Sequence, residues 1–266
     1  MKDEFLIYLE AKIKDRLIIS FDNTDLLLWG TRRNSKVKLL GITLNIGCSN
    51  LRTVKKSFSD PKNQITHVMK FARLLANASS STFFAIAYSL SGDDYFVVTE
   101  PTDPLNWQES VEVNESKMPL LIQTFFGTRL RTLGTAKAVN KATSDWFHDW
   151  ARANLPLEYV RVNIDGLILD KEQRPSILLE TKRSFYSVDS WEPWRADARN
   201  YYLQNLLATK SGLKFWTVYH KKGISVGDKT RIALFIISKV TLGAAKWIIF
   251  RRIDNNARKV LKLVDE

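Results

Sequence analysis

The chain has 266 residues, of which 45% are hydrophobic, so it can form one large domain or two small domains with a real core. Its 40 Lys and Arg residues against 28 Asp and Glu residues give a formal net charge of +12. This surplus favours an anionic partner, nucleic acid ahead of an acidic membrane, over a merely soluble basic surface. Cys48 is the only cysteine, which excludes an intramolecular disulfide and a multi-cysteine zinc site.

The N-terminal segment, residues 1–17, is charged and amphipathic and does not have the pattern of a signal peptide. The apolar runs elsewhere are too short and too interrupted by charges to span a bilayer. We therefore expect a soluble, intracellular, cytoplasmic protein with no membrane partner.

Short apolar runs, broken by Asn, Asp and Gly, predict a strand-rich N-terminal region over residues 1–134, which we consider a candidate DNA-binding region. Its expected strands lie at residues 16–22, 26–31, 37–46, 82–90 and 94–101. Apolar spacing near 3.6 predicts a helix over 62–78, and a second helix is expected within 115–130, closed by Gly127. The sequence indicates no internal repeat.

Residues 135–266 show a different order of elements and are expected to form a second domain. The pattern predicts a helix at 141–155, strands at 159–170 and 176–184 joined by a turn, a helix at 193–212, strands at 213–220 and 231–240, and a C-terminal segment 245–266 that ends helical. This order predicts an α/β fold with a mixed central sheet flanked by helices.

Charged side chains interrupt the two apolar strands at 159–170 and 176–184. Glu180 and Lys182 point to the same face of their strand because side chains alternate along a strand. Asp165 lies on the preceding strand and comes close to Glu180 if the two strands pair as a hairpin around the turn 171–175. The alternative is a solvated pair on the wet face of an edge strand.

Two carboxylates and one ammonium at this position have a definite chemistry. Neighbouring carboxylates raise one another's pKa, and a divalent cation such as Mg²⁺ removes that cost. The cation also neutralises a phosphate oxygen and assists formation of hydroxide from water, while a lysine stabilises developing negative charge. The set predicts metal-assisted phosphodiester hydrolysis, with Mn²⁺ as the alternative to Mg²⁺.

The sequence IDG of residues 164–166, followed at this spacing by ILLETK of residues 177–182, resembles the active-site signature of the PD-(D/E)XK nuclease superfamily. The resemblance covers about residues 140–222 and implies a restriction-endonuclease-like core. It also implies that Asp165 and Glu180 are metal ligands and that Lys182 is the catalytic lysine. Ile164 stands where the nominal pattern has proline.

The helix before the Asp165 strand offers candidates for an additional acid or base, as many members of this superfamily have there. They are Asp145, His148 and Asp149, and Glu158 is a further candidate. Asp145 and Asp149 are four residues apart and share one helix face. The alternative is that this face is simply exposed to solvent.

Residues of the following segment are candidates for nucleic-acid binding: Arg183, Arg195, Arg199 and Tyr202. The alternative is an amphipathic helix with core tyrosines and solvated arginines. Asp197 and Tyr201 have the i, i+4 spacing of a Q-x-x-x-Y element found in some members, but Asp replaces Gln. The aromatic segment 183–194 either borders a DNA groove, with rings stacked on exposed bases, or fills the core.

These features predict a Mg²⁺-dependent endodeoxyribonuclease of the restriction, mobile-element or defence type. Two alternatives remain open: a non-catalytic nucleic-acid-binding protein, and a nuclease subunit that is active only with a protein partner in a transposase-like or repair complex. A homodimer is a further expectation, since a two-fold dimer matches a palindromic target.

Overall fold

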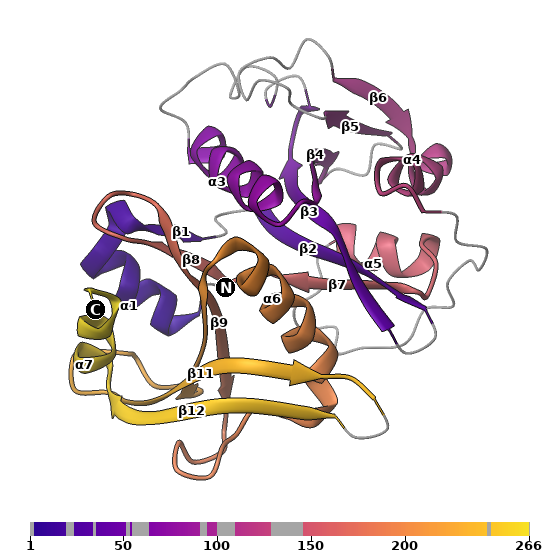
Figure 1. Ribbon diagram of the computed structural model, residues 1–266. Coiled ribbons are helices and arrows are strands. Elements are labelled where there is room, and N and C mark those ends of the chain that lie inside the picture. The colour runs from indigo at the N-terminus through magenta and orange to yellow at the C-terminus, as the bar shows by residue number, and fades with distance from the viewer. Residues whose placement is uncertain are drawn as a thin grey trace. The chain divides into compact units, whose positions relative to one another are not determined.

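In the described part of the chain, two mixed β-sheets of six strands each form the framework, and each sheet belongs to a separate unit. The computed structural model describes residues 3–19, 24–33, 36–51, 54, 64–90, 95–99, 110–128, 146–243 and 246–265. Unit 1 consists of Met1–Ser20 with Ile164–Glu266, and unit 2 of Phe21–Asn163 (Figure 1). The α/β class is as predicted. The division differs from the boundary expected between residues 134 and 135, because it follows the pairing of the strands.

Unit 1 is built on a sheet whose central strands, β9 and β10, are parallel, whereas its other neighbouring strands are antiparallel. The strand order is β1 (Leu17–Ile19), β8 (Gly166–Leu169), β9 (Pro175–Ser184), β10 (Lys214–Lys221), β11 (Arg231–Thr241) and β12 (Trp247–Asn256). Its helical elements are α1 (Glu4–Ile13), η1 (Lys14–Arg16), η5 (Arg195–Asp197), α6 (Ala198–Ser211), α7 (Ala257–Lys262) and η6 (Leu263–Asp265).

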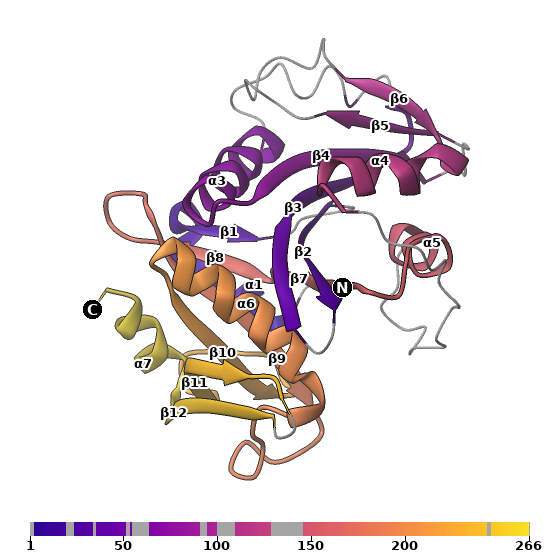
Figure 2. The same cartoon turned by 45° about the vertical axis from the view of Figure 1, so that its right-hand side comes forward.

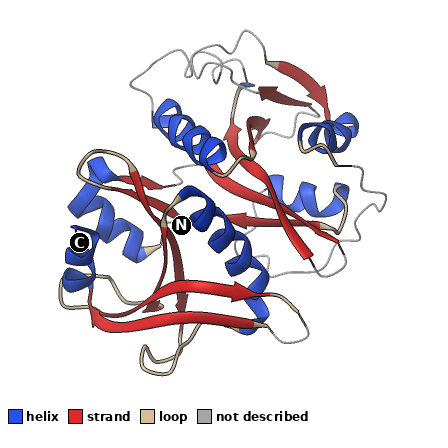
Figure 3. Cartoon of the chain, viewed as in Figure 1, coloured by secondary structure: helices blue, strands red, loops and turns tan. Residues whose placement is uncertain are grey.

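Helices cover both faces of this sheet (Figure 3). On one face, α1 and α7 pack against apolar side chains of the strands, among them Leu179, Val218 and Leu234. On the other face, α6 connects the parallel strands β9 and β10, and the ring of Tyr201 lies 6.3 Å from that of Phe215. This second face carries Glu180 and Lys182.

Unit 2 has its own sheet, in which β3 and β4 are the parallel pair. The strand order is β7 (Tyr159–Asn163), β2 (Thr24–Arg33), β3 (Lys36–Cys48), β4 (Thr82–Ser89), β5 (Tyr95–Thr99) and β6 (Val111–Asn114). Its helical elements are α3 (Gln64–Ala78), η3 (Glu115–Lys117), α4 (Met118–Phe125) and α5 (Trp146–Asn154). Side chains of α4 and α5 share an apolar core with the sheet, and α3 connects β3 to β4 (Figure 2).

The two units have the same topology. In each, the strand order and directions read antiparallel, antiparallel, parallel, antiparallel, antiparallel from one edge to the other, and a helix joins the parallel pair. The element order of the chain also repeats, from α1 to α4 and again from α5 to α7. The repeat that the sequence did not indicate is therefore present in the fold.

The first strand of each repeat pairs with the sheet of the other repeat. β1 pairs with β8, and β7 pairs with β2. The single strand expected over 159–170 is consequently wrong: residues 159–163 belong to unit 2 and residues 166–169 to unit 1. Both parts are apolar enough to be buried, so the sequence pattern alone could not show that they enter different cores.

Gly212 ends α6 in the left-handed conformation, with φ at 70°, and its N–H donates to the carbonyls of Ala208 and Thr209. We expect Gly212→Ala to lower the free energy of unfolding by about 1–2 kcal/mol, because a Cβ is disfavoured in this conformation. Urea unfolding measures the effect. Gly227→Ala is the control: no positive φ restricts that glycine and a Cβ there meets no atom within 4 Å, so its stability should stay near that of the wild type. Equal effects of both substitutions would contradict the prediction.

Candidate active site

A tight hairpin brings Asp165, Glu180 and Lys182 to one part of unit 1. The Oδ1 atom of Asp170 accepts hydrogen bonds from the backbone N–H groups of Glu172 and Arg174, at 2.9 and 2.8 Å, and closes the turn between β8 and β9. The antiparallel register then pairs Gly166 with Leu179. Continued by one residue, this register places Asp165 opposite Glu180, so the hairpin expected around residues 171–175 is confirmed.

Glu180 lies in the middle of the sheet and is only 5% exposed. Its Oε1 atom is 2.6 Å from Nζ of Lys182, two residues along the same strand. Its Oε2 atom accepts a hydrogen bond of 2.5 Å from Nε2 of Gln204, which is buried on α6. A carboxylate so far from water is tolerated because both of its oxygens have partners.

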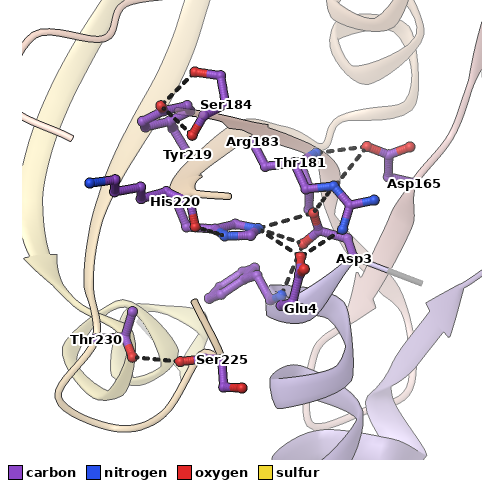
Figure 4. Close-up of polar contacts among 12 residues, drawn as sticks. Asp3, Glu4, Asp165, Thr181, Arg183, Ser184, Tyr219, His220, Ser225 and Thr230 are labelled. Carbon is purple, nitrogen blue, oxygen red and sulfur yellow. Dashed lines mark hydrogen bonds and ion pairs between the residues drawn. The ribbon is translucent and has the colours of Figure 1, made fainter. Parts of the chain in front are cut away.

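Asp165 is partly buried just before β8, and one of its oxygens is held by β9. Oδ2 accepts hydrogen bonds from the backbone N–H of Thr181 at 2.7 Å and from its hydroxyl at 3.1 Å (Figure 4). Burial and the neighbouring negative charge of Glu180 raise the pKa of Asp165 to about 8, although Lys182 and the bonds from Thr181 oppose this. The two carboxylates are therefore electrostatically coupled.

Lys182 lies between Glu180 and the ring of Tyr201 on α6. Burial disfavours its ammonium, but the negative charge of Glu180, with smaller contributions from Tyr201 and Asp165, outweighs burial, so the pKa of Lys182 lies above its ordinary value. Its Nζ atom is 5.9 Å from the centre of the Tyr201 ring. About 29% of its side chain remains exposed, which gives a bound molecule access to the cation.

The Tyr201 hydroxyl is a buried polar group without a hydrogen-bond partner among the described residues. Burial raises the pKa of this phenol, so it is neutral and a donor near pH 7. A buried donor without a partner costs free energy unless a ligand or water satisfies it. Its position beside Lys182 gives the cluster one more group able to hold a polar ligand.

The donor set fits a hard divalent cation. Mg²⁺ takes oxygen ligands and is commonly held by one or two carboxylates together with water and phosphate oxygens. Asp165 and Glu180 supply two carboxylates, and a dication beside them favours the ionised form of Asp165, whose pKa is raised in the isolated protein.

The equivalent positions of unit 2 are apolar. We matched the two units by the registers of their strands. In the helices α3 and α6 we counted back from the residues with positive φ that follow them, Ser80 and Gly212. The equivalent pairs are Asp165 and Leu26, Glu180 and Leu44, Lys182 and Ile46, Tyr201 and Met69, Gln204 and Ala72, and Thr217 and Ala85. All six residues of unit 2 are buried hydrophobics. One topology thus carries a polar cluster in one unit and apolar side chains at the six equivalent positions of the other.

The candidates for an additional acid or base belong to unit 2. Asp145 and the side chain of His148 lie outside the described residues. Asp149 is exposed on α5, and its Oδ1 atom is 3.0 Å from Nη1 of Arg152. Glu158 follows α5 in the same unit. Their roles remain predictions.

The candidates for nucleic-acid binding all lie in unit 1 but in different surroundings. Arg183 is partly buried, and its Nη1 atom donates to Oε2 of Glu4 at 2.7 Å. Arg195 is exposed and stacks on Trp247, with its Cζ atom 4.7 Å from the ring centre. Arg199 is exposed on α6, and Tyr202 is partly buried there.

Three residues of the cluster, Thr181, Tyr201 and Gln204, were not identified from the sequence as site residues. Gln204 lies three residues after Tyr201, so both lie on the side of α6 that faces the sheet. Asp197 occupies the position four residues before Tyr201, where the Q-x-x-x-Y element has Gln, whereas the Gln of this helix follows Tyr201 by three residues. A buried polar residue on an otherwise apolar helix face was the available signal.

A second polar cluster, also not predicted, ties the N-terminus to β10. His220 is fully buried, and its Nε2 atom is 3.0 Å from both carboxylate oxygens of Asp3 (Figure 4). Asp3 also caps α1 by accepting from the backbone N–H of Phe5 at 2.9 Å. Asp3, Glu4 and His220 could together offer ligands to a metal ion, but the guanidinium of Arg183 already supplies positive charge there.

Comparison with known proteins adds no family. No family model matches the chain, and no curated protein matches it. Among solved structures, the chain is weakly similar to the crystal structure of a sex pheromone staph-cAM373 precursor, at 8% identity and a TM-score of 0.22 over 94% of this chain and 82% of that one. A similarity this weak carries no argument about fold or function. No helix among the described residues is long and apolar enough to cross a membrane.

The raised pKa of Asp165 makes stability depend on pH. The folded state holds the proton more tightly than the unfolded state, so this contribution is complete below pH 3.8 and is lost as the pH rises towards about 8. We expect wild-type stability to fall relative to that of Asp165→Asn over this interval, since the Asn oxygen still accepts from Thr181. Urea unfolding in the absence of divalent cations measures the difference, and a pH-independent difference would refute the assignment.

The Asp3–His220 pair allows a second test of pH dependence, in the N-terminal segment. Burial disfavours the charged imidazole, but the hydrogen bond and charge of Asp3 prevail and raise the pKa of His220. The stabilisation is complete below pH 6.5 and is lost as the pH rises through the folded-state pKa.

We therefore expect Asp3→Asn, which keeps a good helix cap, to be destabilised at pH 6 and to approach the wild type at pH 9. Urea unfolding at both pH values measures this. Asp15→Asn, at an exposed aspartate of the same segment, is the control and should show no such convergence.

Proposed function

We propose that unit 1 is a metal-dependent phosphodiesterase domain acting on DNA, with Asp165, Glu180 and Lys182 as its active site. The observation that carries the proposal is the contrast between the units. The same topology in unit 2 fills the equivalent positions with buried apolar residues, so the fold itself does not require the polar cluster. Burial of ionisable groups costs free energy. Where the fold can form without such groups, their presence indicates a functional role.

Each residue has a role that its contacts support. Asp165 and Glu180 would hold a Mg²⁺ or Mn²⁺ ion, which when bound neutralises a phosphate oxygen and lowers the pKa of a water ligand. Gln204 and Thr181 orient the two carboxylates through the hydrogen bonds described above. Lys182, partly exposed and cationic, would stabilise negative charge that develops on the phosphate.

The resemblance to the PD-(D/E)XK superfamily supports the same chemistry. In unit 1, β8 and β9 form the hairpin and α6 leads to the parallel strand β10, an order compatible with the restriction-endonuclease-like core that we propose. The formal charge of +12 is suited to a polyanionic substrate. A restriction, mobile-element or defence enzyme is the role we favour, with a homodimer or a protein partner as further proposals.

One observation favours a second candidate, a nucleic-acid-binding protein without catalysis. Both oxygens of Glu180 already have partners inside the protein, Lys182 and Gln204. Such a closed network serves a purely structural role equally well in the absence of a metal ion. The two candidates differ in whether DNA is cut.

Plasmid cleavage with purified full-length protein separates them. We expect nicking with Mg²⁺ or Mn²⁺, none with EDTA, and a loss of at least about a hundredfold in Glu180→Gln and Lys182→Ala, because each removes a charge from the reacting site. Both variants should still bind DNA.

Glu172→Gln is the matched control, since it alters an exposed carboxylate in the turn of the same hairpin and should cleave like the wild type. Cleavage that persists in Glu180→Gln would exclude this active site. DNA binding without cleavage by the wild type, with either metal, would favour the non-catalytic candidate.

A further inference from the structure

Large aromatic side chains lie exposed directly after β9, directly before η5 and at the start of β12. Phe185 is 74% exposed, Tyr186 62%, Trp194 50% and Trp247 53%. Phe185 is the third residue after Lys182, and Trp194 directly precedes η5, which leads into α6 and Tyr201. We call these four residues the aromatic surface. Exposed apolar side chains that lie together, rimmed by polar groups, are typical of a binding site.

Cations accompany these rings. Nζ of Lys222 lies 5.3 Å from the centre of the Phe185 ring, and the guanidinium of Arg195 lies over Trp247. Tyr186 and Trp194 contact each other edge to face, with centroids 6.3 Å apart. Each ring therefore lies beside a positive charge or another ring, a combination suited to a ligand with flat aromatic groups and negative charges.

The segment after β9, which carries Phe185 and Tyr186, is held by side chains of the sheet. The hydroxyl of Tyr219 donates to the carbonyl of Tyr186 at 2.8 Å and lies 2.7 Å from the hydroxyl of Ser184. The buried ring of Trp191 stacks on Tyr219, with centroids 4.3 Å apart and planes within 3°.

Arg252 completes this support. Its guanidinium donates to the carbonyls of Val188 and Trp191, at 2.6 and 3.0 Å. The segment that carries Phe185 and Tyr186 is thus ordered, which lowers the conformational entropy lost when a ligand binds to it.

We propose that the aromatic surface binds unpaired nucleotides, and that the substrate of unit 1 is single-stranded nucleic acid or DNA with a single-stranded portion. Every base has a flat face that stacks on an aromatic ring, and Lys222 and Arg195 supply charge for the phosphates. Bases inside a duplex are already stacked on one another, so their faces are closed to these rings. The link to a substrate rests on the proposed function, whereas the binding itself does not.

Binding is measured by fluorescence anisotropy of a labelled oligo-dT strand and of a hairpin duplex, with EDTA present so that no cleavage occurs. We expect the wild type to prefer the single strand. Trp194→Ala and Trp247→Ala should each weaken oligo-dT binding between about fivefold and a hundredfold, the effect of losing one stacked base, and change duplex binding less than twofold. Trp194→Phe should retain most of the binding, because a flat ring remains.

Ile7→Ala is the control, because Ile7 is an exposed hydrophobic of α1, 50% exposed, with no ring to stack. Wild-type affinity for oligo-dT in both Trp→Ala variants would overturn the proposal. So would equal affinity of the wild type for strand and duplex, or a preference for anionic phosphatidylserine vesicles over oligo-dT.

The outcome also separates this inference from the proposed nuclease. Preferential binding of the single strand without any cleavage would support the aromatic surface as a binding site and count against the proposed active site. Metal-dependent cleavage with no role for Trp194 or Trp247 would retain the active site and reject the aromatic surface.

Discussion

A carboxylate buried at the centre of a sheet is the constraint on which unit 1 depends. Glu180 is only 5% exposed, and its charge is tolerated because Lys182 and Gln204 bind its two oxygens. The bond from Gln204 links α6 to the centre of the sheet. Burial, together with the negative charge of Glu180, raises the pKa of the second carboxylate, that of Asp165, to about 8. Removal of Lys182 would leave the buried charge of Glu180 without its counterion, and removal of Gln204 would leave Oε2 of Glu180 without its hydrogen-bond donor.

The chain itself contains a natural comparison for this cluster. Unit 2 repeats the topology of unit 1 strand for strand, yet Leu44 and Ile46 occupy the positions of Glu180 and Lys182. The framework of unit 2 thus forms with buried apolar residues at the positions that carry the charges in unit 1. The exchange of β1 and β7 between the repeats ties the N-terminal segment to the unit that carries the cluster.

Strand β9 organises several surfaces of unit 1 at once. Glu180 and Lys182 point towards α6, whereas Arg183 points towards α1 and pairs with Glu4. Beyond its end, Phe185 and its neighbours form the aromatic surface. Because side chains alternate along a strand and the chain leaves the sheet directly after Ser184, one short segment serves catalysis, N-terminal attachment and ligand binding in our proposal.

The sequence by itself determined the α/β class, most strands and helices, and the hairpin that joins Asp165 to Glu180, because these depend on local periodicity and turn chemistry. Only the tertiary structure decided that residues 159–170 split between two sheets, that the fold repeats, and that Gln204, Thr181 and Tyr201 surround the carboxylates. These features depend on which strands pair across long separations in the chain, as β1 and β8 do, and apolar patterns do not encode a strand's partner.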